Sequence, residues 1–373
     1  MAIYLIPFLF FALLAVLYQL RLLRLDRTFY GLALLAIGLF GGLRFETAQD
    51  WPAYETFFQG IDLSQNPIAL YFDEGIVKPQ FEIGFYLLNY IVKYFGGTYS
   101  VVFLIASLFC AYAVYCFTYR LAVNRFYILS IYVSYSFLIL HFAQVRQSIA
   151  IGFFLLGCDY YLRHRGKLTA LVICLVGVFF QYSVISYILL LLVVIKWSKV
   201  KRNKFIWAVC LAFLTAMTVY VINLYFDLYS ILTLIAGPSA AQKINIYKET
   251  QAAHGIGLTV FGAYLLLLAS YFVKFFPHLT EEQAFIARFA IFSMLLTVML
   301  IIIFPGSYVM YSRTYVLACI FQACAASLIF AARKGLLHRA VFVGSLVVAL
   351  VYYVRILTVN KDAYIPYLSI INW

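Results

Sequence analysis

The chain has 373 residues, of which 66% are hydrophobic and 11% are charged. Soluble domains are about 45–50% apolar and about 25% charged, so this composition excludes a soluble enzyme with one membrane anchor and predicts a protein that crosses the bilayer many times. The formal net charge of +13 would indicate nucleic-acid binding in a soluble protein. Here most cations lie in short loops between apolar runs, so no nucleic-acid partner is expected.

Apolar runs recur along the whole length and predict a single transmembrane domain over residues 1–373. A spanning helix needs about 20 residues, and about 17 can suffice, which predicts about twelve spans. We expect them near residues 2–20, 28–43, 99–118, 126–142, 146–162, 168–181, 183–196, 204–222, 257–275, 285–304, 311–331 and 339–356. The first run lacks the basic start and the cleavage site of a signal peptide and is interpreted as a retained span. The pair 168–181 and 183–196 could instead form a tilted helical hairpin.

The distribution of charge predicts the orientation of these spans. With the N-terminus outside, most Lys and Arg lie in inner loops and most acidic residues lie outside, as the positive-inside rule requires. Two long outer segments then remain, residues 44–98 and residues 223–256. Within the first, Phe81–Phe95 is short for a span and carries three polar residues, so we expect an amphipathic helix in the outer interface of the membrane.

Four arginines depart from this charge distribution. They lie at the outer ends of spans, where topology gives no reason for them: Arg44, Arg146, Arg313 and Arg355. An arginine costs about 2.5–3.5 kcal/mol at the centre of a span and less near the interface. Several on the same side therefore indicate an anionic ligand, and the phosphate of a lipid is the first candidate.

The first polar motif, GLRFETAQDWPAY at residues 42–54, follows the second span and contains Arg44, Asp50 and Tyr54. The alternative to a ligand site is an outer anchor followed by a solvated acidic loop. A belt at the membrane surface is also preferred over sugar stacking for the outer aromatic residues Trp51, Tyr54, Tyr71 and Phe72.

The second motif, HFAQVRQSIA at residues 141–150, lies at a break between two spans, and Arg146 and Gln147 begin the second helix. A helix N-terminus offers free N–H groups and a positive dipole end. A guanidinium adds a bidentate donor, and together these groups suit a phosphate. The structural alternative is that Arg146 pairs with Asp50 or Glu82 and pins the outer loop.

Three further motifs lie on the expected outer side. FFQYS at residues 179–183 falls at the tip of the hairpin, where a turn naturally holds polar residues such as Gln181, Tyr182 and Ser183. PGSYVMYSRTY at residues 305–315 places Arg313 one turn into a span without an acidic partner in its own segment. RILTVNKDAYIPY at residues 355–367 is weaker and could be an interfacial belt.

Motifs for nucleotide or metal chemistry are absent from the sequence, including Walker A, DxD, HExxH and GxSxG. The seven cysteines lie in apolar runs and form no CxxC or Cys/His cluster, so neither a disulfide nor a metal site is predicted. ATP-driven transport and metal-dependent transfer are therefore disfavoured, and no cofactor is expected.

In order along the chain, GLRFETAQDWPAY, FEIGFYLLN, VRQSIAIGFFL, FFQYS, SRTY and a terminal IPY are similar to the EpsG family of Wzy-type polymerases, which make bacterial exopolysaccharide and O-antigen. The resemblance covers nearly the whole chain and rests on the series of motifs. It implies an all-α, polytopic membrane protein with a GT-C-like fold. It also implies a metal-independent glycosyltransferase of the inner (cytoplasmic) membrane with its active site facing the periplasm.

Such enzymes move a growing glycan from undecaprenyl pyrophosphate onto the next lipid-linked repeat unit. The implied partners are the lipid-linked donor and acceptor, membrane lipids and, as a further candidate, a chain-length regulator. The family's motifs match this chain at Arg44, Asp50, Tyr54, Glu82, Gly84, Arg146, Gln147 and Arg313. The family often has histidine where this chain has Gln181, and glutamine cannot take up a proton near neutral pH, which argues against a general base there.

The roles expected from this reading follow from the chemistry of a diphosphate leaving group. Arg146 and Arg313 are expected to bind the donor pyrophosphate, and Arg44 the donor or the acceptor phosphate. Catalytic bases are expected among Glu82 and Asp50, with His141 third, although His141 could equally hydrogen-bond a neighbouring span.

Other functions remain open at this point. A transporter or flippase for lipid-linked oligosaccharides should carry basic residues through the middle of the membrane, whereas the charged groups here collect at one surface. An O-antigen ligase would use the same donor with a different acceptor. A membrane-bound acyltransferase is the weakest alternative because only His141 lies near a suitable place.

Overall fold

The computed structural model describes residues 1–23, 27–64, 68, 81–119, 124–196, 256–275, 279–303, 308–332 and 335–369. Within these ranges the regular structure is helical, and extended pairing is limited to one bridge between Arg44 and Ser369. The expected all-α fold is thus confirmed for the part of the chain described. The predicted span 204–222, the second outer loop up to residue 255, and Tyr71 and Phe72 lie outside the described residues.

Within the same ranges, six helices are long and apolar enough to cross a membrane. They are α1 (Ala2–Gln19), α6 (Tyr99–Tyr119), the continuous pair α7 (Arg125–Tyr132) and η1 (Val133–Ala143), α15 (Glu281–Ile303), α16 (Tyr308–Ala332) and α17 (Leu336–Val359). Shorter apolar helices are α2 (Arg27–Gly42), α9 (Lys167–Val178), α10 (Val184–Lys196) and α14 (Ile256–Phe275). These helices make the chain a membrane protein, while twelve spans and a GT-C-like fold stay predictions.

The chain forms two compact units. The first contains Met1–Leu189 and Ala326–Trp373, and the second contains Leu190–Ala325. In the second unit α14 packs against α15. With the exception of Arg313, every residue expected in the functional site belongs to the first unit, which is therefore where the site can be built.

Glycines bring helices of the first unit close together. α2 packs on α6, and a Cβ added at Gly42 would lie 2.8 Å from the Cα of Leu104. α9 packs on α8 (Val145–His164) in the same way, because a Cβ added at Gly177 would lie 2.8 Å from the carbonyl oxygen of Ala150. Small residues that allow such close approach are the usual basis of helix association in lipid.

The predicted span 126–142 is present, but its second part is the 11-residue π-helix η1 rather than an α-helix. π-helices are rare, are mostly single-turn bulges and occur often at functional sites. η1 ends at Ala143. Gln144 follows it and donates its N–H to the carbonyl of Ile139 at 2.6 Å, and α8 begins at Val145. The break expected between two spans is therefore confirmed, and it follows a widened helix that the sequence pattern did not predict.

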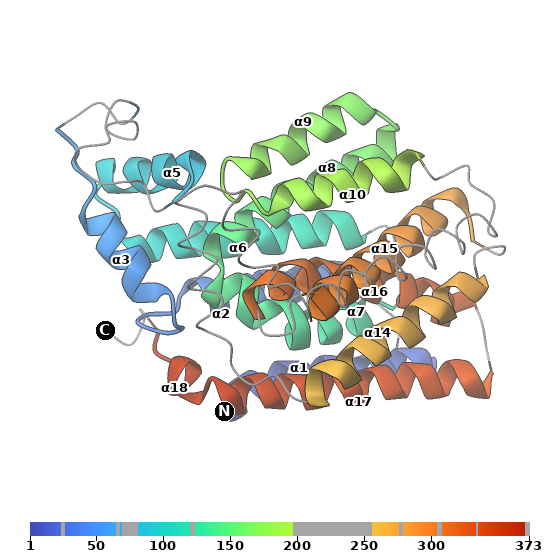
Figure 1. The fold of residues 1–373 in the computed structure, drawn as a ribbon. Coiled ribbons are helices and arrows are strands. Elements are labelled where there is room, and N and C mark those ends of the chain that lie inside the picture. Colours follow the sequence, from blue (N-terminus) through green and yellow to red (C-terminus); the bar gives the residue numbers. More distant parts are fainter. Residues whose placement is uncertain are drawn as a thin grey trace, which may run out of the picture. The chain divides into compact units, whose positions relative to one another are not determined.

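Two helices of residues 44–98 lie against the beginning of α6 (Figure 1). They are α3 (Trp51–Gln59) and α5 (Ile83–Tyr94). The helix expected within Phe81–Phe95 is thus confirmed, and its location at the membrane surface stays a prediction. Lys93 of α5 joins the two helices by donating to three carbonyls at the end of α3, those of Phe58 (3.1 Å), Gln59 (2.7 Å) and Ile61 (2.7 Å).

Lys93→Met is expected to lower the stability of the pair formed by α3 and α5. The substitution keeps the apolar stem but leaves carbonyls at the end of α3 without their cation, which we expect to cost roughly 1 kcal/mol for a half-buried group. The melting temperature of the purified protein measures the effect, with the exposed Lys167→Met as the matched control. Equal melting temperatures for the two variants would contradict this role.

Candidate functional site

Arg44 follows α2, and only 1% of its surface is exposed. Its guanidinium donates to three main-chain carbonyls, those of Gly41 (3.3 Å), Thr47 (3.2 Å) and His141 (2.5 Å). It also lies over the rings of Phe103 (4.1 Å) and Phe142 (5.4 Å). Among the described residues no carboxylate forms an ion pair with it. Arg44 is therefore a buried cation, held by carbonyl dipoles and aromatic faces, that joins the end of α2 to the end of η1.

His141 on η1 is also enclosed, with 1% of its surface exposed. Its Nδ1 lies 2.5 Å from the hydroxyl of Ser107 on α6, and its Nε2 lies 2.5 Å from the hydroxyl of Tyr132 on α7. The hydroxyl of Ser107 in turn donates to the carbonyl of Gly38 at 2.6 Å. The alternative in which His141 hydrogen-bonds a neighbouring span is thus confirmed through Ser107, and this geometry leaves the ring badly placed to act as a base.

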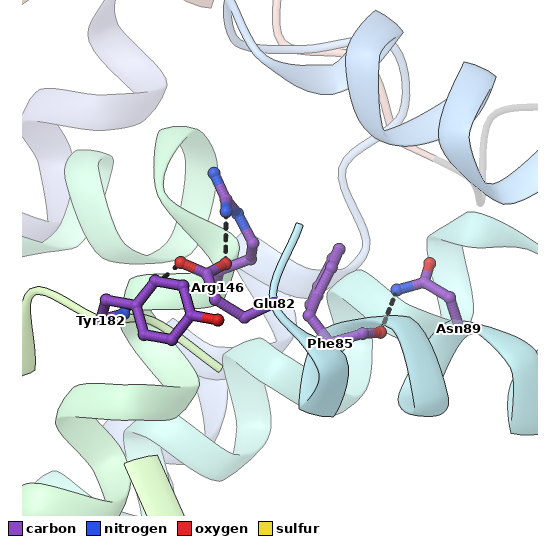
Figure 2. Close-up of polar contacts among 5 residues, drawn as sticks. All are labelled: Glu82, Phe85, Asn89, Arg146 and Tyr182. Carbon is purple, nitrogen blue, oxygen red and sulfur yellow. Dashed lines mark hydrogen bonds and ion pairs between the residues drawn. The ribbon is translucent and has the colours of Figure 1, made fainter. Parts of the chain in front are cut away.

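Glu82 precedes α5, and Arg146 lies in the first turn of α8. The Nη1 atom of Arg146 is 2.5 Å from Oε2 of Glu82, with the two side chains 20% and 7% exposed (Figure 2). Oε1 of Glu82 accepts a hydrogen bond from the N–H of Tyr182 at 3.4 Å. The ion pair that the sequence left open is therefore confirmed, with Glu82 as the partner. Glu82 links α8 to the turn between α9 and α10.

Gly84 brings the beginning of α5 against the same turn. Its N–H donates to the carbonyl oxygen of Phe179 at 2.8 Å, and an added Cβ would lie 2.7 Å from that oxygen. Real Cβ atoms do not approach an oxygen so closely, so only glycine fits where these two backbones meet. The position of Glu82 beside Tyr182 therefore depends on Gly84.

Gly84→Ala is expected to remove most of the protein's activity. The added methyl group would push α5 away from residue 179, which would lengthen the contact between Glu82 and Tyr182 and cost about 1–3 kcal/mol of stability. The activity of the protein and its melting temperature report the two effects. Gly344→Ala on α17 is the control, since no atom lies within 4 Å of its added Cβ. A Gly84→Ala protein that behaves like Gly344→Ala would contradict the close approach.

An aromatic cluster connects the two arginines. The ring of Tyr54 on α3 stacks on Phe81 with ring centroids 5.4 Å apart and meets Phe103 edge-on at 5.7 Å. Arg146 lies over Phe81 at 4.4 Å, and Arg44 over Phe103 at 4.1 Å. Burial raises the pKa of Tyr54, and this effect is larger than the lowering of the pKa by the charge of Arg146. The hydroxyl of Tyr54 is therefore protonated at neutral pH. Tyr54 is 4% exposed and belongs to this core rather than to a membrane belt.

Asp50 is exposed and immediately precedes α3, whose first turn it does not cap with its side chain. Its charge acts on both Arg44 and Tyr54. The motif at residues 42–54 therefore lies beside the aromatic cluster, and the structure brings Arg44, Asp50, Tyr54, Glu82 and Arg146 into one neighbourhood.

The beginning of α8 and the turn at residues 179–183 carry further polar groups. The amide nitrogen of Gln147 donates to the hydroxyl of Tyr187 at 3.2 Å. Gln181 is 5% exposed, whereas Tyr182 is 60% exposed. Buried atoms without a hydrogen-bond partner among the described residues include Oε1 of Gln144, Nε of Arg146 and Oγ of Ser183. Buried polar atoms are nearly always paired, so this region has donors and acceptors to offer a polar ligand or water.

Arg313 and Arg355 are the other two arginines expected at the outer ends of spans. Arg313 lies on α16 in the second unit, so its meeting with Arg146 stays a prediction. Arg355 is exposed near the end of α17. Within the described part of the chain no group of three or more His, Cys, Asp or Glu side chains could hold a metal ion. Metal independence of the chemistry nonetheless stays a prediction.

Sequence reasoning missed the two phenylalanines on which the arginines lie. Phe81 immediately precedes Glu82, so an aromatic residue beside a candidate acid was a usable signal. Phe103 lies inside an apolar span, where nothing in the pattern distinguishes it from residues that face lipid.

Comparison with known proteins identifies the family of this chain. A model of the EpsG family matches residues 27–369, which is well over half of the sequence. Searches of curated proteins and of solved structures found no match. The match includes the outer motif at Arg44, the Glu82–Arg146 pair and the late Arg313. The chain therefore belongs to the EpsG family, which makes it a membrane protein of the polysaccharide-polymerase type.

Proposed function

We propose that this protein is a metal-independent glycosyltransferase that polymerises undecaprenyl-pyrophosphate-linked oligosaccharide repeat units on the periplasmic side of the bacterial inner membrane. The family match over residues 27–369 carries this proposal. Support from the site comes from Arg146, a partly exposed cation at a helix N-terminus with buried, unpartnered polar atoms around it. Such a place suits a diphosphate.

Arg146 can bind a diphosphate without moving from its position at the start of α8. A guanidinium has five N–H donors, and one nitrogen, Nη1, makes the ion pair with Glu82. As the bond between the sugar carbon and the diphosphate oxygen breaks, negative charge grows on the leaving group. A donor fixed at that point lowers the activation free energy by roughly 3–4 kcal/mol. A second cation for the diphosphate is the role that we propose for Arg313.

Glu82 is the first candidate for the base, with Asp50 second. The hydroxyl of the acceptor sugar attacks the anomeric carbon of the donor glycan, its proton passes to the carboxylate, and the lipid diphosphate leaves with the bonding electrons. A diphosphate that binds Arg146 competes with Glu82 for the guanidinium and so frees Oε2 for this proton. Arg44 and His141 are enclosed, so we assign them the role of holding helix ends rather than of touching substrate.

Reconstitution of the purified protein with lipid-linked repeat units tests the proposal. Polymers of increasing length, linked by new glycosidic bonds and accompanied by release of lipid diphosphate, are the expected result. Movement of the lipid-linked unit between leaflets without new bonds would identify a flippase instead. Transfer only when lipid A core is added would identify an O-antigen ligase.

A further inference from the structure

The last described residues return to the loop that follows α2. The N–H of Phe45 donates to the carbonyl of Leu368 at 2.9 Å, and the N–H of Ala48 donates to the carbonyl of Ala363 at 2.7 Å. The short helix α18 (Lys361–Tyr364) begins this returning segment. We call residues 361–369 the C-terminal clasp. It covers one edge of loop 43–49 with main-chain hydrogen bonds, although more than 300 residues of sequence separate the two.

Side chains strengthen this contact and anchor it to two helices. The hydroxyl of Thr47 accepts a hydrogen bond from the N–H of Leu368 at 3.3 Å. The ring of Tyr367 stacks on Phe40 of α2 with centroids 4.5 Å apart, and its hydroxyl donates to the carbonyl of Phe40 at 2.8 Å. On α1, the hydroxyl of Tyr4 donates to the carbonyl of Tyr364 at 2.6 Å. The clasp is thus fixed on α1 and α2 and can hold the loop against them.

Loop 43–49 requires such support. It has no regular secondary structure, and two of its residues other than glycine have left-handed backbone angles: Glu46 at φ 46° and Ala48 at φ 87°. These conformations are unfavourable for residues with a Cβ and persist where the surroundings determine them. Ala48, one of these two residues, donates its N–H to the clasp. The clasp therefore helps to select the shape of the loop.

The loop in turn determines where the outer motif lies. Arg44 is its second residue, and Asp50 follows it immediately before α3. α3 carries Tyr54, whose ring stacks on Phe81, and Phe81 is the ring on which Arg146 lies. A displacement of the loop would consequently move the aromatic surface beneath Arg146.

We infer that the C-terminal clasp is a positioning element for the active site, and that Thr47 and Tyr367 are its positioning residues. They act on Arg146 through α3 and touch no substrate. The catalytic part of this inference rests on the proposed function, whereas the existence of the clasp does not.

A cysteine pair tests the clasp directly. In Ala48→Cys/Ala363→Cys, mild oxidation in native membranes is expected to form a disulfide, identified as a linked peptide by mass spectrometry, because the backbones of these residues are hydrogen-bonded. Each single substitution is the control for pairing with native cysteines. Absence of the linked peptide from the double variant would overturn the clasp, whether or not the protein is a polymerase.

Thr47→Val tests the positioning role with little change of volume. Misplacement of catalytic groups by about 1 Å can lower turnover about 100-fold, so we expect kcat to fall about 10- to 100-fold with KM nearly unchanged, and Thr47→Ser to restore it. Tyr367→Phe, which keeps the stacked ring and loses one hydrogen bond, should show a smaller fall. Wild-type kcat in Thr47→Val, or an equal loss in Thr47→Ser, would overturn the positioning role. An inactive wild-type protein would overturn the proposed function, and the disulfide would still decide the clasp.

Discussion

Arg146→Ala is expected to abolish long-chain polymer while the protein remains in the membrane. The substitution removes the cation that stands at the start of α8 over Phe81, so a diphosphate leaving group loses its best-placed donor. The loss of one such donor corresponds to roughly 3–4 kcal/mol, or a fall in turnover of about 100- to 1000-fold. Electrophoresis of the polymer and a single-turnover assay measure the effect. Arg146→Lys keeps the charge but not the bidentate donor and should retain only a small part of the activity.

The same helix provides a matched control. Near its other end Arg163 forms an ion pair with Asp159, four residues earlier, with Arg163 31% exposed. An exposed pair of this kind contributes about 0–1 kcal/mol, so Arg163→Ala should leave polymer length unchanged. Normal chain lengths in Arg146→Ala, or equal losses in the two variants, would contradict a specific role for Arg146.

Glu82→Gln is expected to be nearly as damaging as Arg146→Ala. Glutamine keeps an oxygen that can accept from the N–H of Tyr182, so the turn at residues 179–183 should stay in place. It removes the group that would take the proton of the attacking hydroxyl, and a general base contributes about 100- to 10,000-fold. A fall of this size in kcat, with a small change in melting temperature, is the expected result.

Three companion variants decide what Glu82 does. Glu82→Ala also removes the contact with Tyr182 and should lower the melting temperature further. Asp50→Asn tests the second candidate base, and the partly exposed Glu55→Gln on α3 is the neutral control. High activity in Glu82→Gln together with an inactive Asp50→Asn would transfer the role of base to Asp50 and leave Glu82 as an anchor for Arg146.

Much of the helical framework could be predicted from the sequence because apolar length alone specifies it. The predicted spans 2–20, 99–118 and 126–142 coincide closely with α1, α6 and the α7–η1 pair. The helix within Phe81–Phe95 and the short pair on either side of residue 182 were also predicted. The number of spans and their orientation cannot be predicted as firmly, because they depend on every segment of the chain and on the position of the membrane.

The site was predictable as a set of residues but not as a set of contacts. Arg146 beside a gap between two spans marked a cation worth explaining, yet choosing between Asp50 and Glu82 as its partner required the three-dimensional path of the outer segment. The contacts of Arg44 were likewise not predictable from the sequence. Its carbonyl partners and aromatic neighbours come partly from η1 and α6, far away in sequence, so its burial could not be predicted from the local pattern.

Long-range backbone contacts were the least accessible to sequence reasoning. The need for glycine at position 84 arises from the carbonyl of Phe179, and the role of the terminal IPY motif arises from the loop at residues 43–49. Neither contact has a local signature in composition or periodicity. The π-helical form of η1 likewise cannot be distinguished from an α-helical span by hydrophobicity.

Binding of undecaprenyl pyrophosphate to the purified protein in nanodiscs tests the central claim most directly, because it isolates the contact between diphosphate and guanidinium from the later chemistry. We expect Arg146→Ala to weaken binding about tenfold or more, as expected when a charge-assisted hydrogen bond of about 1.5–3 kcal/mol is lost, while Arg163→Ala binds as the wild type does. Equal affinities for wild type and Arg146→Ala would contradict the assignment of Arg146 to the lipid diphosphate.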